Sequence, residues 1–297
     1  MWLLRARLNA VRDGHAGGMS AQGPGADDGD DALRTRIVET VDGGSLAVQE
    51  LGPPDGPPLL LLSGQANSHR WWSRVRDELA AEHRTISFDY RGTGGSSGVE
   101  VGDRDWSTSS FAADAALVLD ALAVEQACVY GTSMGGRVAQ MLALDHPEKV
   151  HRLALACTSP GGSLATERDA QVRRGLADPD WPGRREFVVG LFYSPDGAAE
   201  FGPGSPLLGD PTMTAAAAGA HLKASARHDA CERLRDIDCP TLVLHGEEDV
   251  MVPTCNAPVL AEEISGARLA LVPQGRHGFF EEFAWIVTPA ILDFFAE

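Results

Sequence analysis

The sequence predicts an α/β protein whose core is a doubly wound, mostly parallel β-sheet, with a small helical segment inserted into it. Strand-like and helix-like segments alternate from about residue 35 onward, as in parallel sheets with helices on both faces. The segment "PPLLLLSG" is nearly all apolar, as expected of a strand covered on both sides. Residues 160–228 differ from the rest, because they are alanine-rich, helical in pattern and interrupted by prolines.

The strands and helices can be placed in order along the chain. "RTRIVET" and "SLAVQEL" flank Asp42-Gly43-Gly44, a turn signal that predicts a hairpin. Further strands are expected at "PPLLLLSG" (57–64), "RTISFDY" (84–90), "CVY" (128–130), "HRLALAC" (151–157), "PTLVLHG" (240–246) and "ARLALVP" (267–273). Helices with one apolar face are expected at 72–81, 111–122, 138–146 and 280–296, with another between the last two strands.

These elements divide the chain into three parts. Residues 1–33 begin with a short arginine-bearing stretch and continue as a glycine-rich, acidic segment, which we expect to be disordered. Residues 34–159 and 229–297 contain the strand signals and form the predicted core. Residues 160–228 form a predicted helical cap.

Composition and charge argue against several classes of function. The 297 residues carry 42 acidic and 25 basic side chains, a formal net charge of −17, so a nucleic-acid partner is not expected. The five cysteines form no C-x-x-C pair, which favours buried free thiols and predicts a reducing, cytoplasmic location. No apolar run approaches the ~18–20 residues of a membrane span. No close pair of histidines predicts a metal site.

The segment "VYGTSMGGR", residues 129–137, places Ser133 where a strand ends and a helix begins. Gly131 and Gly135 lack side chains that would collide at this corner, so the hydroxyl stands clear of the sheet. It lies beside a helix N-terminus, where an anion is favoured. The pattern alone fits either a helix N-cap or a nucleophile. A nucleophilic serine needs a base, and the base needs an orienting acid.

The G-x-S-x-G pattern resembles the nucleophile elbow of the α/β-hydrolases, in which the chain order is Ser, then Asp or Glu, then His. Asp249 in "HGEEDVMVP" and His277 in "LVPQGRHGFF" follow two later strands in this order, at the sheet edge where ligands bind. Glu247 and Glu248 compete with Asp249, which is preferred because it fits the family's H-G-x-x-D pattern. Taken singly, Asp249 fits a turn and His277 a surface loop. Together with Ser133 they predict a catalytic triad.

The resemblance also implies an oxyanion hole of two backbone N–H groups. One belongs to Met134, directly after the serine, and the other to Gln65 in the loop "SGQA", where Ser63 replaces the histidine of many relatives. One of two adjacent tryptophans is expected in the core and the other in the acyl pocket, without preference between them. The candidate substrate-binding residues are Gly64, Trp71, Trp72 and His228.

The similarity extends over about residues 36–296 and implies an eight-stranded α/β-hydrolase sheet. It includes "SFDYRGTGGSS", which matches the family's D-x-R-G-x-G-x-S segment and is expected to brace the loop rather than take part in chemistry. The whole pattern is similar to the branch that holds 3-oxoadipate enol-lactonase, cofactor-free haloperoxidases or perhydrolases, and methylesterases.

The predicted function is therefore hydrolysis of a small-to-medium carboxylic ester through an acyl-enzyme, with no cofactor and no metal. Enol-lactone hydrolysis, perhydrolysis, C–C bond hydrolysis and ligand binding without turnover stay open as alternatives. Four arginines of the cap are interpreted as solvated helix residues, which favours an apolar small-molecule ester over a dicarboxylate lactone. They are Arg173, Arg174, Arg184 and Arg185.

Overall fold

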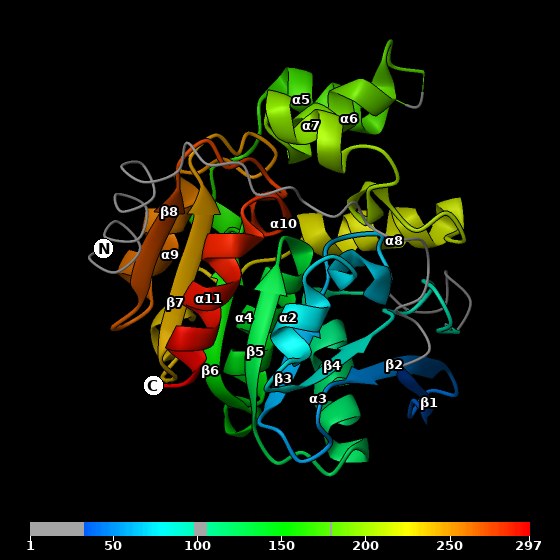
Figure 1. The fold of residues 1–297 in the computed structure, drawn as a ribbon, viewed down its shortest axis with the longest axis vertical. Helices are drawn as coiled ribbons and strands as arrows, with labels where there is room; N and C mark the ends of the chain where they lie inside the picture. Colours follow the sequence, from blue (N-terminus) through cyan, green and yellow to red (C-terminus); the bar gives the residue numbers. More distant parts are fainter. Residues whose placement is uncertain (1–32, 98–105, 179) are drawn as a thin grey trace.

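An eight-stranded sheet forms the centre of the computed structural model, which describes residues 33–97, 106–178 and 180–297. Its strands lie in the order β1-β2-β4-β3-β5-β6-β7-β8 (Figure 1). β2 runs antiparallel to both its neighbours, and every other neighbouring pair is parallel, which confirms the predicted fold class. The strands are β1 (Arg34–Glu39), β2 (Ser45–Leu51), β3 (Pro58–Leu62), β4 (Arg84–Phe88), β5 (Ala127–Thr132), β6 (Val150–Ala156), β7 (Thr241–Gly246) and β8 (Arg268–Val272).

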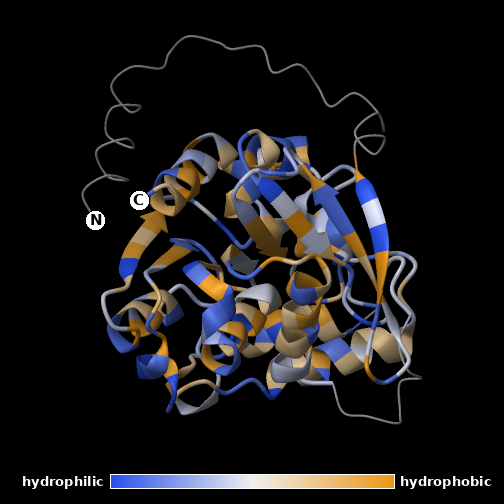
Figure 2. Cartoon of the chain, turned by 90° about the horizontal axis from the view of Figure 1, so that it is seen from below, coloured by the Kyte–Doolittle hydropathy of each residue, from blue (hydrophilic) through white to orange (hydrophobic). Residues whose placement is uncertain are grey.

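Both faces of the sheet are covered, and the alternation along β3 shows this. Leu60 and Leu62 belong to one buried apolar cluster, and Leu59 and Leu61 to the other, because successive side chains of a strand point to opposite faces. The helices carry hydrophilic and hydrophobic residues together, as amphipathic helices on a sheet do (Figure 2). One face packs against α3 (Thr108–Ala121), α4 (Met134–Asp145) and α9 (Asn256–Glu263), and the other against α2 (Arg76–Ala80) and α11 (Ala284–Phe295).

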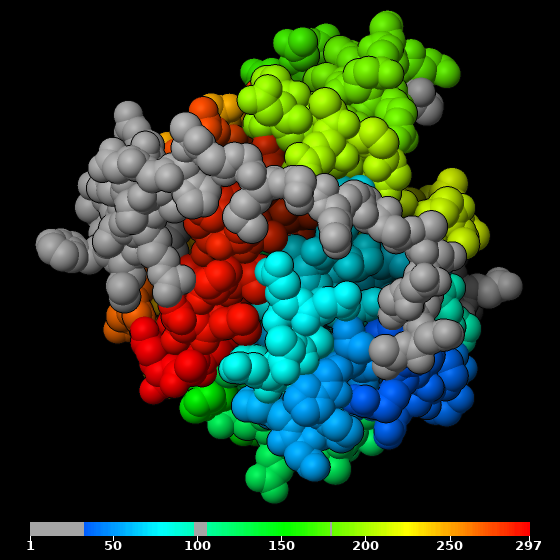
Figure 3. Space-filling model, viewed as in Figure 1, coloured from blue at the N-terminus to red at the C-terminus, as the bar shows by residue number. Residues whose placement is uncertain are grey.

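Every element described between β6 and β7, up to residue 226, is helical. Helices α5, α6 and α7 gather beyond one end of the sheet, and α8 lies closer to it (Figure 1). The group stands out from the body of the molecule (Figure 3). The elements are η4 (Gly162–Leu164), α5 (Ala170–Ala177), α6 (Arg184–Phe192), α7 (Pro195–Phe201), η5 (Pro206–Leu208) and α8 (Ala215–Ala226), followed by η6 (Leu234–Asp236) before β7.

The inserted segment begins and ends at neighbouring backbone positions. Gly161 and Asp229 form an isolated antiparallel bridge. The amide of Ala230 donates to the carbonyl of Pro160 at 3.0 Å, and that of Gly162 to the carbonyl of residue 228 at 3.2 Å. These bonds join the two ends of the segment directly above the sheet.

Two predicted helices are divided in the structure. The helix expected at 72–81 is a 3₁₀ turn, η2 (His69–Trp72), followed by α2, because both tryptophans of the turn are buried and adjacent residues of an α-helix do not share one face. The helix expected at 280–296 is α10 (Phe279–Glu282) followed by α11, with a break at Phe283.

The segment from Asp89 to Ser96 braces the loops at this end of the sheet, as predicted. Asp89 accepts hydrogen bonds from the amides of His69 and Gly95, at 2.7 and 2.9 Å. Arg91 forms a bidentate pair with Asp114 on α3, at 2.6 Å for both bonds. None of these residues lines the cavity described below.

The expected disordered segment, residues 1–33, lies outside the described residues apart from Leu33. Within the described ranges, no helix combines the length and apolarity that crossing a bilayer requires.

Candidate active site

Ser133 occupies a strained corner between β5 and α4. Its φ is 55° and its ψ is −120°, a conformation that a residue with a side chain rarely adopts. The flanking glycines make the corner possible. A Cβ on Gly135 would lie 2.0 Å from the carbonyl oxygen of Leu62, and one on Gly131 would lie 2.4 Å from the carbonyl oxygen of Gly135. The Ser133 amide donates to the carbonyl of Ala156 on β6 at 2.9 Å, which fixes the corner to the sheet.

Three side chains form one hydrogen-bonded chain at the carboxyl ends of β5, β7 and β8. Ser133 Oγ lies 2.9 Å from His277 Nε2, and His277 Nδ1 lies 2.8 Å from Asp249 Oδ2. Asp249 and His277 are 3% and 1% exposed, so water competes little with the bond between them. When the imidazole is neutral, a proton on Nδ1 is donated to the carboxylate and Nε2 is left as an acceptor for the hydroxyl.

The turn after β7 holds the Asp249 carboxylate in a fixed orientation. Its Oδ1 accepts hydrogen bonds from the amides of Met251 and Val252, both at 2.9 Å. His245 Nε2 lies 2.9 Å from the Val252 carbonyl and 3.2 Å from Asp249 Oδ2. Burial raises the pKa of Asp249, but the charge of His277 and hydrogen bonds from both histidines outweigh burial and hold it well below its ordinary value.

The cap helps to position His277. The His277 and Gly278 amides donate to the carbonyls of Leu191 and Phe192 at the end of α6, at 3.2 and 2.7 Å. The Phe192 ring packs edge-on against the imidazole, with centroids 5.5 Å apart. Arg276 Nη1 donates to the carbonyl of Gly190 at 2.6 Å. His277 is therefore held by contacts from both the core and the cap.

Two backbone amides flank the serine without a partner among the described residues. Met134 is the first residue of α4, so its amide is one of the unsatisfied donors of a helix N-terminus. Gln65 lies in the loop after β3 and lines the same cavity as Ser133, and its carbonyl accepts a hydrogen bond from Asn67. The next amide, that of Ala66, is directed instead to His221 Nδ1 at 3.4 Å. Within the described residues, the amide of Met134, directly after Ser133, and that of Gln65, on the wall of the cavity that Ser133 also lines, therefore have no hydrogen-bond partner.

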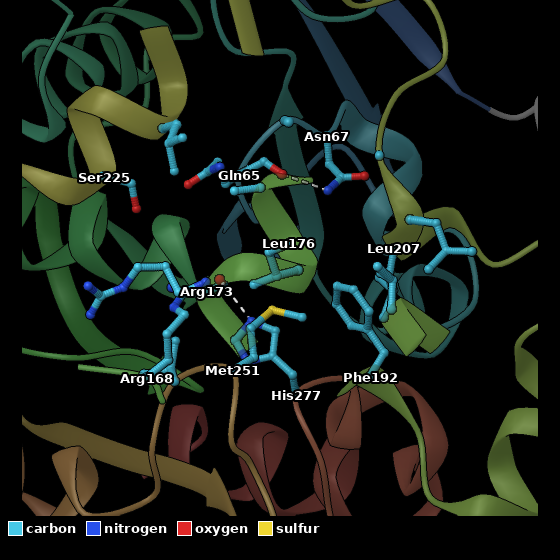
Figure 4. A pocket seen from close by; sticks show the side chains of 18 of the residues that line it. Gln65, Asn67, Arg168, Arg173, Leu176, Phe192, Leu207, Ser225, Met251 and His277 are labelled. Carbon is cyan, nitrogen blue, oxygen red and sulfur yellow. Dashed lines mark hydrogen bonds between the residues drawn. The ribbon is translucent and has the colours of Figure 1, made fainter. Parts of the chain in front are cut away.

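A cavity of about 420 Å³ opens between the core and the cap, and Ser133 and His277 lie on its wall. Apolar side chains of the cap form one side of it, where Phe192 and Leu207 are seen in Figure 4. Arg168 and Arg173 lie on the other side, and His277 lies between the two groups (Figure 4).

Several known proteins are similar to this chain in sequence and fold. The family model for the α/β hydrolase fold matches residues 57–202. A putative carbamate hydrolase, RutD, of Azorhizobium caulinodans is 32% identical over 250 residues, which cover 82% of this chain and 92% of the relative. The chain belongs to the α/β-hydrolase fold family.

Further α/β-hydrolases match over most of their length. The rhodomycin D methylesterase DauP of Streptomyces sp. is 30% identical over 279 residues, 82% of this chain and 92% of that protein. The crystal structure of a hydrolase from Pseudomonas aeruginosa PA01 superposes with a TM-score of 0.74 at 27% identity, covering 91% of this chain and 100% of that one. The chain is a hydrolase of this family.

The structure shows which of the two adjacent tryptophans lines the cavity and which lies in the core. Trp71 lines the cavity, and its Nε1 donates to Thr132 Oγ1 at 2.8 Å. Trp72 is fully buried in the core, where its ring packs 5.0 Å from that of Tyr130, so its assignment as a substrate-binding residue was wrong. Gly64 does not line the cavity either. A Cβ there would lie 2.4 Å from the Trp71 ring, so the glycine makes room for the tryptophan.

The interpretation of His228 as a substrate-binding candidate was also wrong. The residue is 3% exposed and lies behind the cavity wall, with Nδ1 3.0 Å from Thr108 Oγ1 and Nε2 3.3 Å from Gln140 Oε1. Burial lowers its pKa to about 3, so it serves as a neutral hydrogen-bonding residue of the core.

The sequence interpretation missed the positive side of the cavity. Arg173 and Arg184 line it, although the sequence placed them in solvent, whereas Arg174 and Arg185 stay outside. Arg137 lines it too, and its spacing of four residues from Ser133 was a usable signal, because positions i and i+4 share a helix face. Arg168 precedes α5 in an irregular segment, where no periodicity points to its position.

Within the described ranges, no group of three or more His, Cys, Asp or Glu side chains is placed to hold a metal ion.

Proposed function

We propose that this α/β-hydrolase cleaves a small-to-medium carboxylic ester, with Ser133 as nucleophile, His277 as general base and Asp249 as the orienting acid. The observation that carries the proposal is the hydrogen-bonded chain from Ser133 through His277 to Asp249, which ends at a hydroxyl in the cavity. A serine hydroxyl is a weak nucleophile until a positioned base takes its proton. An N-cap role is not supported, because the Ser133 side chain makes no capping hydrogen bond.

The reaction proceeds in two acyl-transfer steps. His277 Nε2 takes the proton of Ser133 as the hydroxyl oxygen attacks the ester carbonyl, and Asp249 stabilises the resulting imidazolium. The amides of Gln65 and Met134 donate to the oxyanion, a contribution worth about 10²–10³ in rate for each such donor. His277 then protonates the leaving alcohol. Water then attacks the acyl carbonyl while His277 takes one of its protons, and His277 returns that proton to Ser133 Oγ as the acid leaves.

The named relatives support this choice of bond. The DauP protein is a methylesterase, and RutD is named a putative carbamate hydrolase. Both ester and carbamate have a carbonyl bonded to a heteroatom that leaves, which is the electrophile that a serine with an oxyanion hole attacks. The cavity of about 420 Å³ lies at the lower end of ligand pockets, ~300–1,000 Å³, which favours a small or medium substrate.

A cytoplasmic location remains part of the proposal. All five cysteines are unpaired in the structure, and Cys128 and Cys157 are buried. Free thiols are typical of proteins from reducing compartments.

The test is hydrolysis of 4-nitrophenyl esters from acetyl to longer chains, measured by release of 4-nitrophenolate. We expect turnover by the wild type to fall by about 10⁴-fold or more in Ser133→Ala. The exposed Ser73, which lies on the loop after η2, provides the matched control, and Ser73→Ala should keep wild-type activity. Equal turnover by the wild type and Ser133→Ala, with both folded by circular dichroism, would refute the proposal.

A further inference from the structure

The cavity is positively charged on one side, although the chain as a whole is strongly acidic. Four arginines line it, and within the described residues Glu167 supplies the one carboxylate of the lining. The whole chain has a formal net charge of −17. A concentration of cations in one cavity of an acidic protein therefore needs a local explanation. The four arginines are Arg137, Arg168, Arg173 and Arg184.

One of the four has a structural role. Arg184 Nη1 donates to the carbonyls of Gly175, Leu176 and Asp178, at 2.7, 3.1 and 3.0 Å. These are the unsatisfied carbonyls at the end of α5, so Arg184 caps that helix.

Two others line the same cavity as Ser133 and His277 and form no ion pair with a described carboxylate. Arg137 donates to the carbonyl and hydroxyl of Ser225, at 2.6 and 2.9 Å, and to the hydroxyl of Ser159 at 3.0 Å, all of them neutral. The guanidinium of Arg168 has neither a hydrogen bond nor an ion pair within the described part of the chain. Glu167 also lines the cavity and its charge acts on both arginines, but it forms no ion pair with either.

Desolvation makes these charges costly. Burial and the neighbouring charge of Arg168, opposed by the charge of Glu167, together lower the pKa of Arg137 to about 10. Burial also lowers the pKa of Arg168, against the opposing effects of Glu167 and Asp249. Both arginines are partly buried, and neither forms an ion pair with a described carboxylate, so the lost hydration is only partly offset by distant acidic groups. A carboxylate that pairs directly with a guanidinium forms short, charge-assisted bonds.

We propose that this wall is a carboxylate-binding subsite, and that the substrate is an ester that carries a second, ionised carboxylate held by Arg168 and Arg137. The substrate class rests on the function proposed above. Arg137 follows Ser133 by one helical turn, about 6 Å along the axis, so the anion is a few carbon atoms away from the scissile carbonyl. Arg173, exposed at the cavity mouth, adds a third positive charge on the same side.

The opposite side of the cavity fits the remaining part of such a substrate. Phe192 and Leu207 face the arginines across the cavity, with His277 between them (Figure 4). An apolar alkyl group packs there without an unsatisfied polar contact, and the carboxylate turns toward the arginines. The two sides together fix the direction in which the ester lies on the serine.

Binding to Ser133→Ala tests the subsite without any turnover. The probes are monomethyl glutarate and its neutral counterpart, dimethyl glutarate, titrated by calorimetry at low salt. We expect the monoanion to bind at least tenfold more tightly, as hydrogen bonds to a charged group imply, and the preference to shrink with added sodium chloride. Equal binding of the two probes, or no binding of either, would overturn the proposal.

A second substitution in the same background assigns the preference to the arginine. Arg168→Gln should clearly reduce the preference for the monoanion, leaving the part due to Arg137, and should leave folding intact, because this guanidinium holds no other residue. Arg174→Gln is the matched control, since Arg174 is exposed on α5 and lies outside the cavity, and it should keep the preference. A preference in the Arg168→Gln variant as large as that of the Ser133→Ala background overturns the assignment. Hydrolysis of neutral esters is measured separately, so a failure of the serine mechanism is distinguishable from a failure of the subsite.

Discussion

The backbone strain at Ser133 predicts that Ser133→Gly stabilises the fold relative to Ser133→Ala. Both substitutions remove the hydroxyl and its hydrogen bond to His277 at 2.9 Å, so their difference isolates the backbone. The φ of 55° and ψ of −120° are accessible to glycine but strained for alanine, at a cost of about 1–3 kcal/mol.

The unfolded chain partly offsets this gain. Glycine loses more conformational freedom on folding than alanine, which costs about 0.4–1 kcal/mol. The Ser133→Gly variant should therefore exceed Ser133→Ala by about 0.5–2 kcal/mol in the free energy of unfolding. For a chain of this size each kcal/mol raises the melting temperature by about 2–4 °C.

The assay is thermal unfolding of both variants, followed by circular dichroism, with chemical denaturation to obtain the free energies. Ser73 provides the control, because its φ of −55° and ψ of −29° are ordinary helical values. At Ser73 the sign reverses, and the glycine variant should be the less stable of the pair. If Ser133→Gly unfolds at or below the temperature of Ser133→Ala, the corner does not store the strain assigned to it.

Two further predictions concern buried charges. Because the folded-state pKa of Asp249 is depressed, its carboxylate stabilises the fold above its unfolded pKa of about 3.9, and the contribution is lost as the pH falls below that value. The stability difference between the wild type and Asp249→Asn, from urea titrations, should shrink between about pH 6 and about pH 3; a constant difference would contradict this. Arg91→Met leaves Asp114, which is 3% exposed, without its cation and should cost about 3–5 kcal/mol by the same measurement. The double variant Arg91→Met/Asp114→Leu should recover much of that loss, and a cost below about 1 kcal/mol in the single variant would refute the assignment.

The core strands were predictable because their pattern has a local physical cause. A strand covered on both faces must be apolar throughout, and β3, with four consecutive leucines, is such a strand. Gly131 and Gly135 were equally informative, since a side chain at either position would overlap the neighbouring backbone. The positions of Ser133, Asp249 and His277 at strand ends followed from the order of the strands.

The cap side of the site was not predictable in the same way. Arg168 and Arg173 face the cavity because of how the cap segment folds back over the sheet, and no period in the sequence encodes that path. Trp71 and Trp72 are adjacent and chemically identical, so only the turn geometry of η2 decides which of them lines the cavity. His228 was misjudged because a buried histidine with neutral partners has the same sequence signature as a binding histidine.

The two ends of the inserted segment are joined by hydrogen bonds, so the cap can be replaced as a unit. Because the chain leaves at Pro160 and returns at Ala230 through hydrogen-bonded neighbours, a lid of another length can be grafted there without opening the sheet. Doubling the length of such a loop costs only about 0.6 kcal/mol in closure entropy. Substrate selectivity can therefore be changed by exchanging the cap, without altering Ser133, Asp249 or His277. The new cap must keep backbone carbonyls where those of Leu191 and Phe192 accept the amides of His277 and Gly278.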